Sequence, residues 1–339
     1  MASGKENQQG KKWSTTVLIG IVFLLASASC GKKDDSSKDD GALFPIKVQL
    51  DWVAEPEHGG VYTAQALGFF IDEGLDVTLV QGGTGSYSLN KVGSGIADIG
   101  QADGTSVILA AANGAPLLNI AAIFQQDPSV LMLHSTNPIS SWEELDGKTI
   151  MARPEWPFLP FIQNRYGISF EVIPQNFQLT RLIKDESFVQ QGFYIAEPYY
   201  AEQEGVELKY LYAWDAGFDA YTVLFTNKKF AREHPEKLKS FLRALKRGYF
   251  EYIEGDPEPA HQIMKEINPK VTPEFLTWSR NMIINEKLHR GNPSAGFFAD
   301  YLEITPERFR KQIDQLVELE IINDGDIEVK DVMTTEFLP

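Results

Sequence analysis

Hydrophobic and polar residues follow two different periods along the chain from Phe44 onward. Short apolar runs of strand length occur at residues 46–50, 75–80, 97–100 and 116–123. Segments that read as helices alternate with them, at residues 59–68, 86–94 and 104–113. In the first of these, Val61, Ala64 and Leu67 are spaced three apart, as on one side of a helix. Strands that alternate with helices in this way predict βαβ units and a mostly parallel sheet.

A second series of apolar runs begins near Val130 and predicts a second α/β unit. Its strands are expected at residues 130–135, 148–152, 170–174, 192–196 and 221–227, with a helix at 157–166. The remainder of the chain has helical periodicity. Pro235 opens one helix and Pro306, after the N-cap Thr305, opens another. The first of these helices carries an apolar stripe formed by Leu238, Phe241, Leu242, Leu245 and Phe250.

These two series predict two lobes that the chain connects twice, near residues 124–132 and 221–227. We expect lobe 1 to comprise residues 44–128 and 226–339, and lobe 2 to comprise residues 129–225. Two connections make a hinge, and a cleft between two lobes is a common place for a small molecule.

The N-terminal segment has the order of a secretory signal. Lys11 and Lys12 precede an apolar run at residues 17–25, which is followed by small residues. Cys30, the only cysteine in the chain, stands where the small residues end. This order resembles a bacterial lipoprotein signal, in which Cys30 is lipidated, although Ser27 stands where that pattern has Leu, Val or Ile.

We therefore expect a signal peptide at residues 1–29 and a lipidated Cys30 followed by a charged tether, together residues 30–43. A plain membrane anchor or an ordinary cleaved signal remains the alternative. A single cysteine excludes an internal disulfide, so the exported chain must rely on its core.

Composition narrows the classes of function. The hydrophobic fraction of 43% is enough for a sizeable core, and the net charge of −16 argues against nucleic acid as a partner. Net charge bears on solubility and steering, and it says little about the chemistry of a small-molecule site.

Candidate chemistry gathers directly after the first strand, in "LDWVAEPEHGG". Trp52 lies past the carboxyl end of that strand, where open α/β sheets bind ligands, and its ring could stack on a heterocycle or fill the lobe edge. Glu55, Glu57 and His58 make a weak metal set, and a solvated loop is the favoured interpretation. His58 could contact ligand from the start of the next helix, and Tyr62 could face either cleft or core.

Two further strand ends carry polar residues. The turn "QGGTGS" lacks the Lys-Ser/Thr ending of a nucleotide P-loop. Its backbone at Gly83, with Ser86 and the following helix N-terminus, could hold a carbonyl or an anion, or the glycines could simply form a tight turn. Asp103 follows a strand and opens a helix, so we expect an N-cap that also borders the cleft.

In the second lobe, Glu197 stands at a strand end before Pro198. Its carboxylate could accept hydrogen bonds from an exocyclic amine, with Tyr199 covering the ring, or it could face water. Tyr221 lies near the second connection. Arg153 is the only basic residue close to these positions, so an amine-bearing aromatic heterocycle fits better than a sulfonate.

The order of "LDWVAEPEHGGVYTAQALGFFIDEGLDVTLVQGGTG", "KVGSGIADIGQADG", "ANGAPLLNIAAI" and "LDGKTIMA" resembles the thiamine-pyrimidine family of solute-binding proteins. Relatives of that family include riboflavin-binding and sulfonate-binding proteins of ABC importers. The resemblance runs from about residue 46 to about 265. It implies the type II periplasmic binding fold, and it matches Glu155 and Trp156 to a Glu-aromatic pair in the family's ligand-binding loop.

A eukaryotic branch of this family makes the pyrimidine ring from pyridoxal phosphate and a histidine of its own chain. Ala102 and Ser106 stand where those enzymes have Lys and His, and "WDAGFDA" lacks their cysteines. Without the amine no Schiff base can form, so the departure favours binding over synthesis.

The sequence therefore predicts a monomeric, exported, lipid-anchored solute-binding protein that serves an ABC permease. Its expected ligand is a planar nitrogen heterocycle, a thiamine pyrimidine precursor such as hydroxymethylpyrimidine or formylaminopyrimidine, with riboflavin as the alternative. A sulfonate binder and a pyridoxal-phosphate enzyme are the remaining readings. We expect no catalytic residue, no cofactor, no metal and no nucleic acid.

Overall fold

The computed structural model describes residues 42–84, 86–291 and 299–339. The expected signal segment 1–29, Cys30 and nearly all of the tether lie outside this part of the chain. Among the helices that the structure describes, none combines the length and the apolar character that crossing a bilayer requires.

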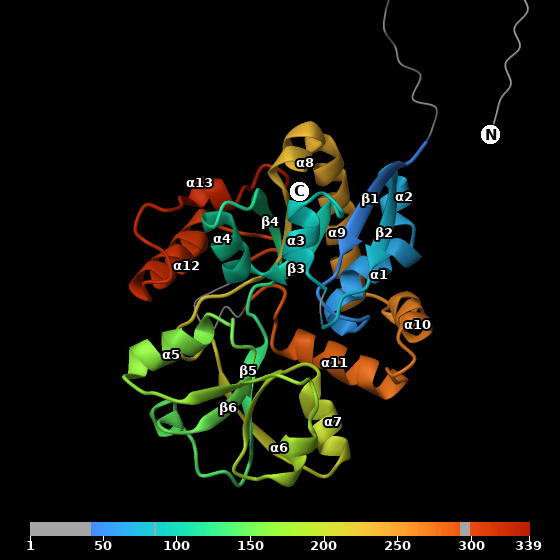
Figure 1. Ribbon diagram of the computed structural model, residues 1–339. Helices are drawn as coiled ribbons and strands as arrows, with labels where there is room; N and C mark the ends of the chain where they lie inside the picture. Colours follow the sequence, from blue (N-terminus) through green and yellow to red (C-terminus); the bar gives the residue numbers. More distant parts are fainter. Residues whose placement is uncertain (1–41, 85, 292–298) are drawn as a thin grey trace, which may run out of the picture. The chain divides into compact units, whose positions relative to one another are not determined.

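Two five-stranded sheets form the framework (Figure 1). The first sheet has the strand order β2-β1-β3-β10-β4, with β1 (Phe44–Gln49), β2 (Leu75–Val80), β3 (Ile99–Asp103), β4 (Leu117–Phe124) and β10 (Thr222–Asn227). The second sheet has the order β7-β6-β8-β5-β9, with β5 (Ser129–His134), β6 (Thr149–Ala152), β7 (Glu171–Pro174), β8 (Val189–Phe193) and β9 (Leu208–Tyr212).

Helices cover these sheets. Those before β5 are η1 (Pro56–His58), α1 (Gly59–Ala66), α2 (Phe69–Asp72), α3 (Ser88–Gly93) and α4 (Gly104–Ala112). Those between β5 and β10 are η2 (Glu143–Leu145), α5 (Phe158–Tyr166), α6 (Thr180–Lys184) and α7 (Glu197–Gln203). Those after β10 are α8 (Lys228–Glu233), α9 (Pro235–Glu254), α10 (Glu258–Ile267), α11 (Pro273–Asn285), α12 (Pro306–Glu318) and α13 (Val329–Val332).

The first sheet is buried on both faces, which explains its nearly continuous apolar strands. Within β10, Leu224 belongs to the core cluster shared with α1 and α9, whereas Val223 and Phe225 belong to the cluster shared with α4 and α12. Side chains alternate between the faces of a strand, so one strand serves both clusters. In Figure 1, α4, α12 and α13 gather at one side of this sheet, and α1, α2 and α9 at the other.

The last strand of the first sheet runs against its neighbours. β10 pairs antiparallel with both β3 and β4, and Thr222 stands opposite Asp103. All of β10 therefore belongs to the first sheet, and the lobe boundary expected after residue 225 falls inside this strand. The hydroxyl of Thr222 donates to Asp127 at 3.1 Å, which ties the two connections between the sheets together.

Close packing of α1 on α9 fixes the loop that follows β1. A Cβ on Gly60 would lie 2.2 Å from the Tyr249 ring, and one on Gly248 would lie 2.2 Å from the Gly60 carbonyl oxygen. The two helix backbones can approach this closely only because both positions are glycine. The Tyr249 hydroxyl then donates to the backbone oxygen of Glu57 at 3.2 Å, inside the loop.

Most expected elements are confirmed, with three differences. The Thr305 side chain caps α12 as predicted, since it accepts from the backbone N–H of Arg308. Phe250 was expected on the inner face of α9 and is 55% exposed, so that assignment was wrong. The strand expected at residues 192–196 lies at Val189–Phe193, and the pattern did not predict β9 at all.

We predict that Gly248→Ala lowers the free energy of unfolding by roughly 1–3 kcal/mol, because the added methyl group overpacks the α1–α9 contact. Gly93→Ala is the matched control, since its Cβ would meet only Leu117, at 3.9 Å. The gain in helix propensity should make this control neutral or up to about 1 kcal/mol more stable. Urea denaturation followed by circular dichroism measures both, and equal losses would contradict the close-packing argument.

Candidate ligand-binding site

A cavity of about 460 Å³ is lined by residues from both sheets and their connecting loops. The side chains from the first lobe that matter below are Asp51, Trp52, Glu55, Glu57, Gln101 and Asp103. Those from the second lobe and the connections are Asp127, Arg153, Glu155, Gln175, Phe177 and Glu197. The first-lobe residues lie beyond or at the carboxyl ends of β1 and β3, where α/β sheets generally bind ligands.

Two aromatic rings meet in this cavity, one from each lobe. Trp52 follows β1 and Phe177 follows β7, and their ring centroids are 5.0 Å apart with planes inclined by 38°. Phe177 is partly exposed and has a left-handed backbone with φ of 58°. Asn176 supports this turn, because its side-chain oxygen accepts from the backbone N–H of Gln178 at 3.0 Å. A bulky residue held in this conformation indicates that the ring is needed there.

Carboxyl groups dominate the polar part of the wall. Among the described residues, seven acidic side chains line the cavity, and Arg153 is the only Lys or Arg that does so. Burial, and then the nearby Glu197, raises the pKa of Glu55 to about 8. Burial also raises the pKa of Glu57 well above its usual range, and Asp51, Glu55 and Glu197 add to this effect. The described part of the cavity therefore crowds acidic groups whose ionised form is disfavoured.

His58 lies behind this wall. Its side chain is fully buried, and its Nε2 lies 3.1 Å from Asp51 Oδ1 and 3.4 Å from Glu57 Oε1. The expected solvated loop is thus a buried cluster at Glu57 and His58. Single donor atoms of Asp51, Glu57 and His58 all lie within 4.8 Å of one another, a spacing that a cation could bridge. Glu55, which the sequence grouped with a metal set, is not part of that trio.

The glycine-rich turn supports the loop after β1. The backbone N–H groups of Gly82 and Gly83 donate to the carbonyl oxygens of Trp52 and Asp51, at 2.8 and 3.0 Å. A Cβ on Gly82 would lie 2.2 Å from the Asp51 backbone, and Gly83 has a φ of 122°. These donors are already used, so the turn positions Trp52 and the tight-turn interpretation is favoured over an anion site. Gly83 and Ser86 still line the cavity.

Strand ends and helix starts place the remaining polar side chains. Asp103 caps α4 by accepting from the backbone N–H and hydroxyl of Ser106, at 2.9 and 2.6 Å, and it also lines the cavity. Glu197 begins α7 and accepts from the backbone N–H of Phe193 at 2.7 Å. Gln101 is only 1% exposed, and neither atom of its side-chain amide has a hydrogen-bond partner among the described residues.

Of the residues that the sequence singled out, six line the cavity: Trp52, Gly83, Ser86, Asp103, Glu155 and Glu197. The structure does not bring the other five to the wall, for reasons of packing. His58 and Tyr62 are buried beneath it, and the Tyr62 hydroxyl accepts from Gln81. Trp156 lies in the core of the second lobe, with its ring 4.6 Å from Phe158.

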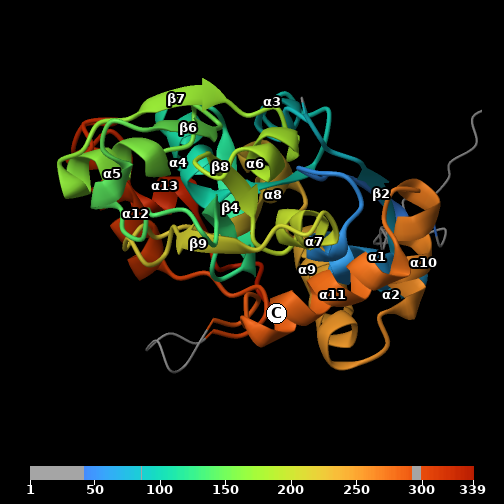
Figure 2. The ribbon, with the colours of Figure 1, turned by 90° about the horizontal axis from the view of Figure 1, so that it is seen from below.

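Tyr199 and Tyr221 serve contacts outside the cavity. Tyr199 of α7 packs against Phe275 and Trp278 of α11, and Figure 2 shows these helices side by side. Tyr221 is fully buried, with its ring stacked on Phe309. Each tyrosine therefore holds elements of the two lobes or the connection in place.

Sequence reasoning missed Gln101, Asp127, Gln175 and Phe177. Gln101 directly follows the run 97–100 that was predicted as a strand, so its position after that strand was available as a signal. Phe177 is the one large apolar side chain in "PQNFQ", directly after a predicted strand, and an apolar residue in such a polar loop is a comparable signal.

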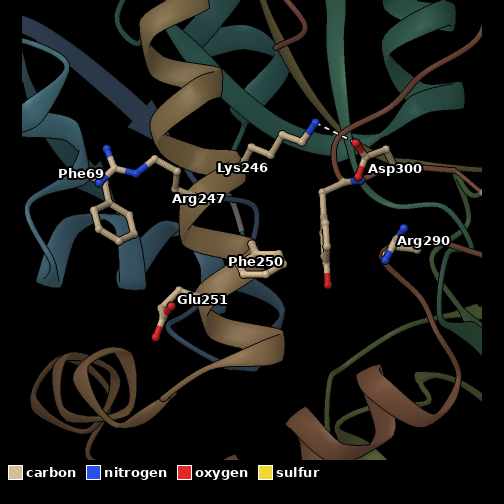
Figure 3. A pocket seen from close by; sticks show the side chains of 8 residues that line it. Phe69, Lys246, Arg247, Phe250, Glu251, Arg290 and Asp300 are labelled. Carbon is tan, nitrogen blue, oxygen red and sulfur yellow. Dashed lines mark hydrogen bonds and ion pairs between the residues drawn. The ribbon is translucent and has the colours of Figure 1, made fainter.

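A second and larger pocket, of about 580 Å³, lies over α9 and away from the strand ends (Figure 3). Its charged side chains are paired with each other or with neighbours: Lys246 lies 2.8 Å from Asp300, and Arg247 lies 3.1 Å from Asp72. The smaller cavity is the better candidate, because polar and aromatic side chains from both lobes converge in it.

Comparison with known proteins gives the chain its context. It is 26% identical over 303 residues to the formylaminopyrimidine-binding protein of Halalkalibacterium halodurans. The matched region covers 85% of this chain and 90% of that protein. It is 21% identical to the riboflavin-binding protein RibY of Chloroflexus aurantiacus, and the match covers 95% of this chain and 97% of that protein. It is also 24% identical to a 4-amino-5-hydroxymethyl-2-methylpyrimidine phosphate synthase of Legionella pneumophila, covering 78% and 88%.

Solved structures agree on the architecture. The periplasmic aliphatic sulphonate-binding protein SsuA of Escherichia coli superposes with a TM-score of 0.62 at 12% identity, covering 85% of this chain and 97% of that one. This likeness confirms the predicted type II periplasmic binding fold with two α/β lobes. The family model described as NMT1/THI5 like matches residues 55–260, more than half of the chain. The chain therefore belongs to the NMT1/THI5-like family.

Proposed function

We propose that this chain is the solute-binding component of an ABC importer and that it binds an aminopyrimidine-type heterocycle in the cavity between its lobes. A ligand that contacts both lobes favours the closed arrangement, and the closed arrangement is what a permease would recognise. Relatives that are named as binding proteins span nearly the whole chain, which supports a binding role.

The observation that carries this proposal is the pairing of aromatic and carboxyl groups from opposite lobes. Trp52 and Phe177 offer ring faces for a flat molecule, and Glu55 and Glu197 offer acceptors for its N–H groups. Aromatic stacking adds about 0.5–1.5 kcal/mol beyond the burial of area. Hydrogen bonds to charged groups are roughly twice as strong as neutral ones.

The rival proposal is an enzyme that makes the pyrimidine. Ala102 and Ser106 line the cavity at the positions where the enzymes of the family have Lys and His, and Ser106 is engaged with Asp103. No lysine is found among the described residues that line this cavity, so a Schiff base with pyridoxal phosphate has no amine there. Mixing the protein with pyridoxal phosphate should therefore give no imine absorbance.

The identity of the ligand can be tested directly. We expect native mass spectrometry of the purified protein, supplied in turn with formylaminopyrimidine and with riboflavin, to show a one-to-one complex with the pyrimidine. Isothermal titration calorimetry measures the two affinities. Tighter binding of riboflavin would move the assignment to the other relative, and binding of neither would contradict the proposed ligand class.

We expect Trp52→Leu to weaken pyrimidine binding by roughly 3- to 10-fold, because it removes the ring face but keeps an apolar side chain. Phe250→Leu is the control, since this exposed aromatic residue on α9 lies in the second pocket, outside the cavity. Calorimetry should give the control the affinity of the parent protein. Equal affinities for Trp52→Leu and the parent would exclude the stacking role.

Export and lipid anchoring through Cys30 belong to the same proposal. We expect Cys30→Ala to prevent labelling of the protein by radioactive palmitate and to move it from the membrane fraction to the soluble fraction. Cys30→Ser offers a closer match in size and should behave alike. Persistent membrane association of both variants would favour the plain anchor.

A further inference from the structure

Three carboxyl groups from the two lobes meet in the cavity. Glu55 and Glu57 come from the loop between β1 and α1, and Glu197 begins α7 in the second lobe. Glu197 raises the pKa of both other groups, and Glu55 raises that of Glu57, so the three lie close enough to repel one another when charged.

The described residues of the cavity place little positive charge near these three carboxyl groups. Among the described residues of the lining, Arg153 is the only Lys or Arg. Burial raises the pKa of Asp127, and Arg153 opposes this rise only in part. His58 touches Glu57 but shares its Nε2 with Asp51. The carboxyl group of Glu55 accepts no hydrogen bond from the described residues, and that of Glu197 accepts from the N–H of Phe193.

Gln101 is an independent sign of a ligand in the same cavity. It lies in the middle of β3 and lines the cavity, it is almost fully buried, and both atoms of its side-chain amide lack partners among the described residues. A buried amide without partners costs free energy comparable to a lost hydrogen bond. An amide can donate to a ring nitrogen and accept from an adjacent amine, as Asn and Gln do with adenine.

We propose that the ligand carries a protonated amino group as a substituent of its ring. This ammonium lies among Glu55, Glu57 and Glu197, and the Gln101 amide forms hydrogen bonds with the edge of the ring. This inference rests on the proposed function and names the class of its ligand as a cationic aminopyrimidine. Burial disfavours the ionised form of these three carboxyl groups, and an ammonium among them would favour it.

The same charge would couple binding to closure. Glu55 and Glu57 belong to one lobe and Glu197 to the other, so a cation among them attracts both lobes at once. An anionic ligand such as a phosphate or sulfonate would add to the negative charge of the wall and is disfavoured by the same argument.

A matched pair of probes tests the inference. They are 4-amino-5-hydroxymethyl-2-methylpyrimidine, which is neutral, and the same pyrimidine with an aminomethyl group, which is cationic at neutral pH. With a chelator present, we expect calorimetry to show the aminomethyl compound binding at least tenfold more tightly. In Glu197→Gln the ratio of the two affinities should fall below threefold.

Control variants keep this test decisive. Glu202→Gln alters an exposed carboxylate on the same helix and should retain the full preference. Glu55→Gln repeats the test if Glu197→Gln fails to fold, as judged by circular dichroism. If the hydroxymethyl compound binds as tightly as the aminomethyl compound or more tightly, the proposed ammonium is wrong, whereas the proposed function still holds.

Two further outcomes have separate meanings. If neither pyrimidine binds, the proposed function fails and the inference fails with it. A titration with Zn²⁺ alone, without chelator, addresses the other source of positive charge. Binding of Zn²⁺ that is lost in Glu197→Gln, together with a loss of the aminomethyl preference, would replace the ammonium by a metal ion and overturn the inference.

Discussion

Crowding of carboxyl groups where two lobes meet is the constraint on which the rest of this structure depends. Burial disfavours the charged form of a carboxyl group, and neighbours of the same sign disfavour it further. Glu55 and Glu57 experience both effects, and burial raises the pKa of Glu197. Among the described residues of the wall, Arg153 is the only Lys or Arg. A fold keeps such an arrangement only where something else holds the groups in place. Here the packing of α1 on α9 through Gly60 and Gly248 holds the loop of Glu55 and Glu57.

Contacts near the two connections give the second lobe a defined relation to the first. The Thr222 hydroxyl donates to Asp127, and Arg308 of α12 pairs with Asp219 at 2.5 Å, just before β10. Tyr199 of α7 packs on two aromatic rings of α11. Thr222 and Asp127 themselves line the cavity, whereas Arg308, Asp219 and Tyr199 are not among its lining residues. One contact between the connections is therefore part of the cavity wall.

The fold was largely predictable from the sequence, whereas the site was predictable only in part. Alternating strands and helices indicated two α/β lobes, because periodicity is a local property of the chain. The antiparallel insertion of β10 between β3 and β4 depends on tertiary pairing, so the boundary at residue 225 fell inside a strand. Trp52 and Glu197 were found from their places at strand ends. The sequence could not show that Trp156 and Tyr221 are core residues and not ligand contacts, because an aromatic residue near a strand end can take either role.

The comparison with the enzymes of the family shows how little of the fold needs to change for a different chemistry. A synthase and two binding proteins are all similar to this chain over most of its length. By the resemblance drawn from the sequence, Ala102 in β3 and Ser106 in α4 stand where the enzymes of the family have Lys and His. The strand edge, the glycine turn and the Asp103 cap are built from backbone geometry and remain compatible with either set. Among the described residues, the cavity wall carries seven acids and no lysine, and this composition supports the proposal that the cavity holds an amine.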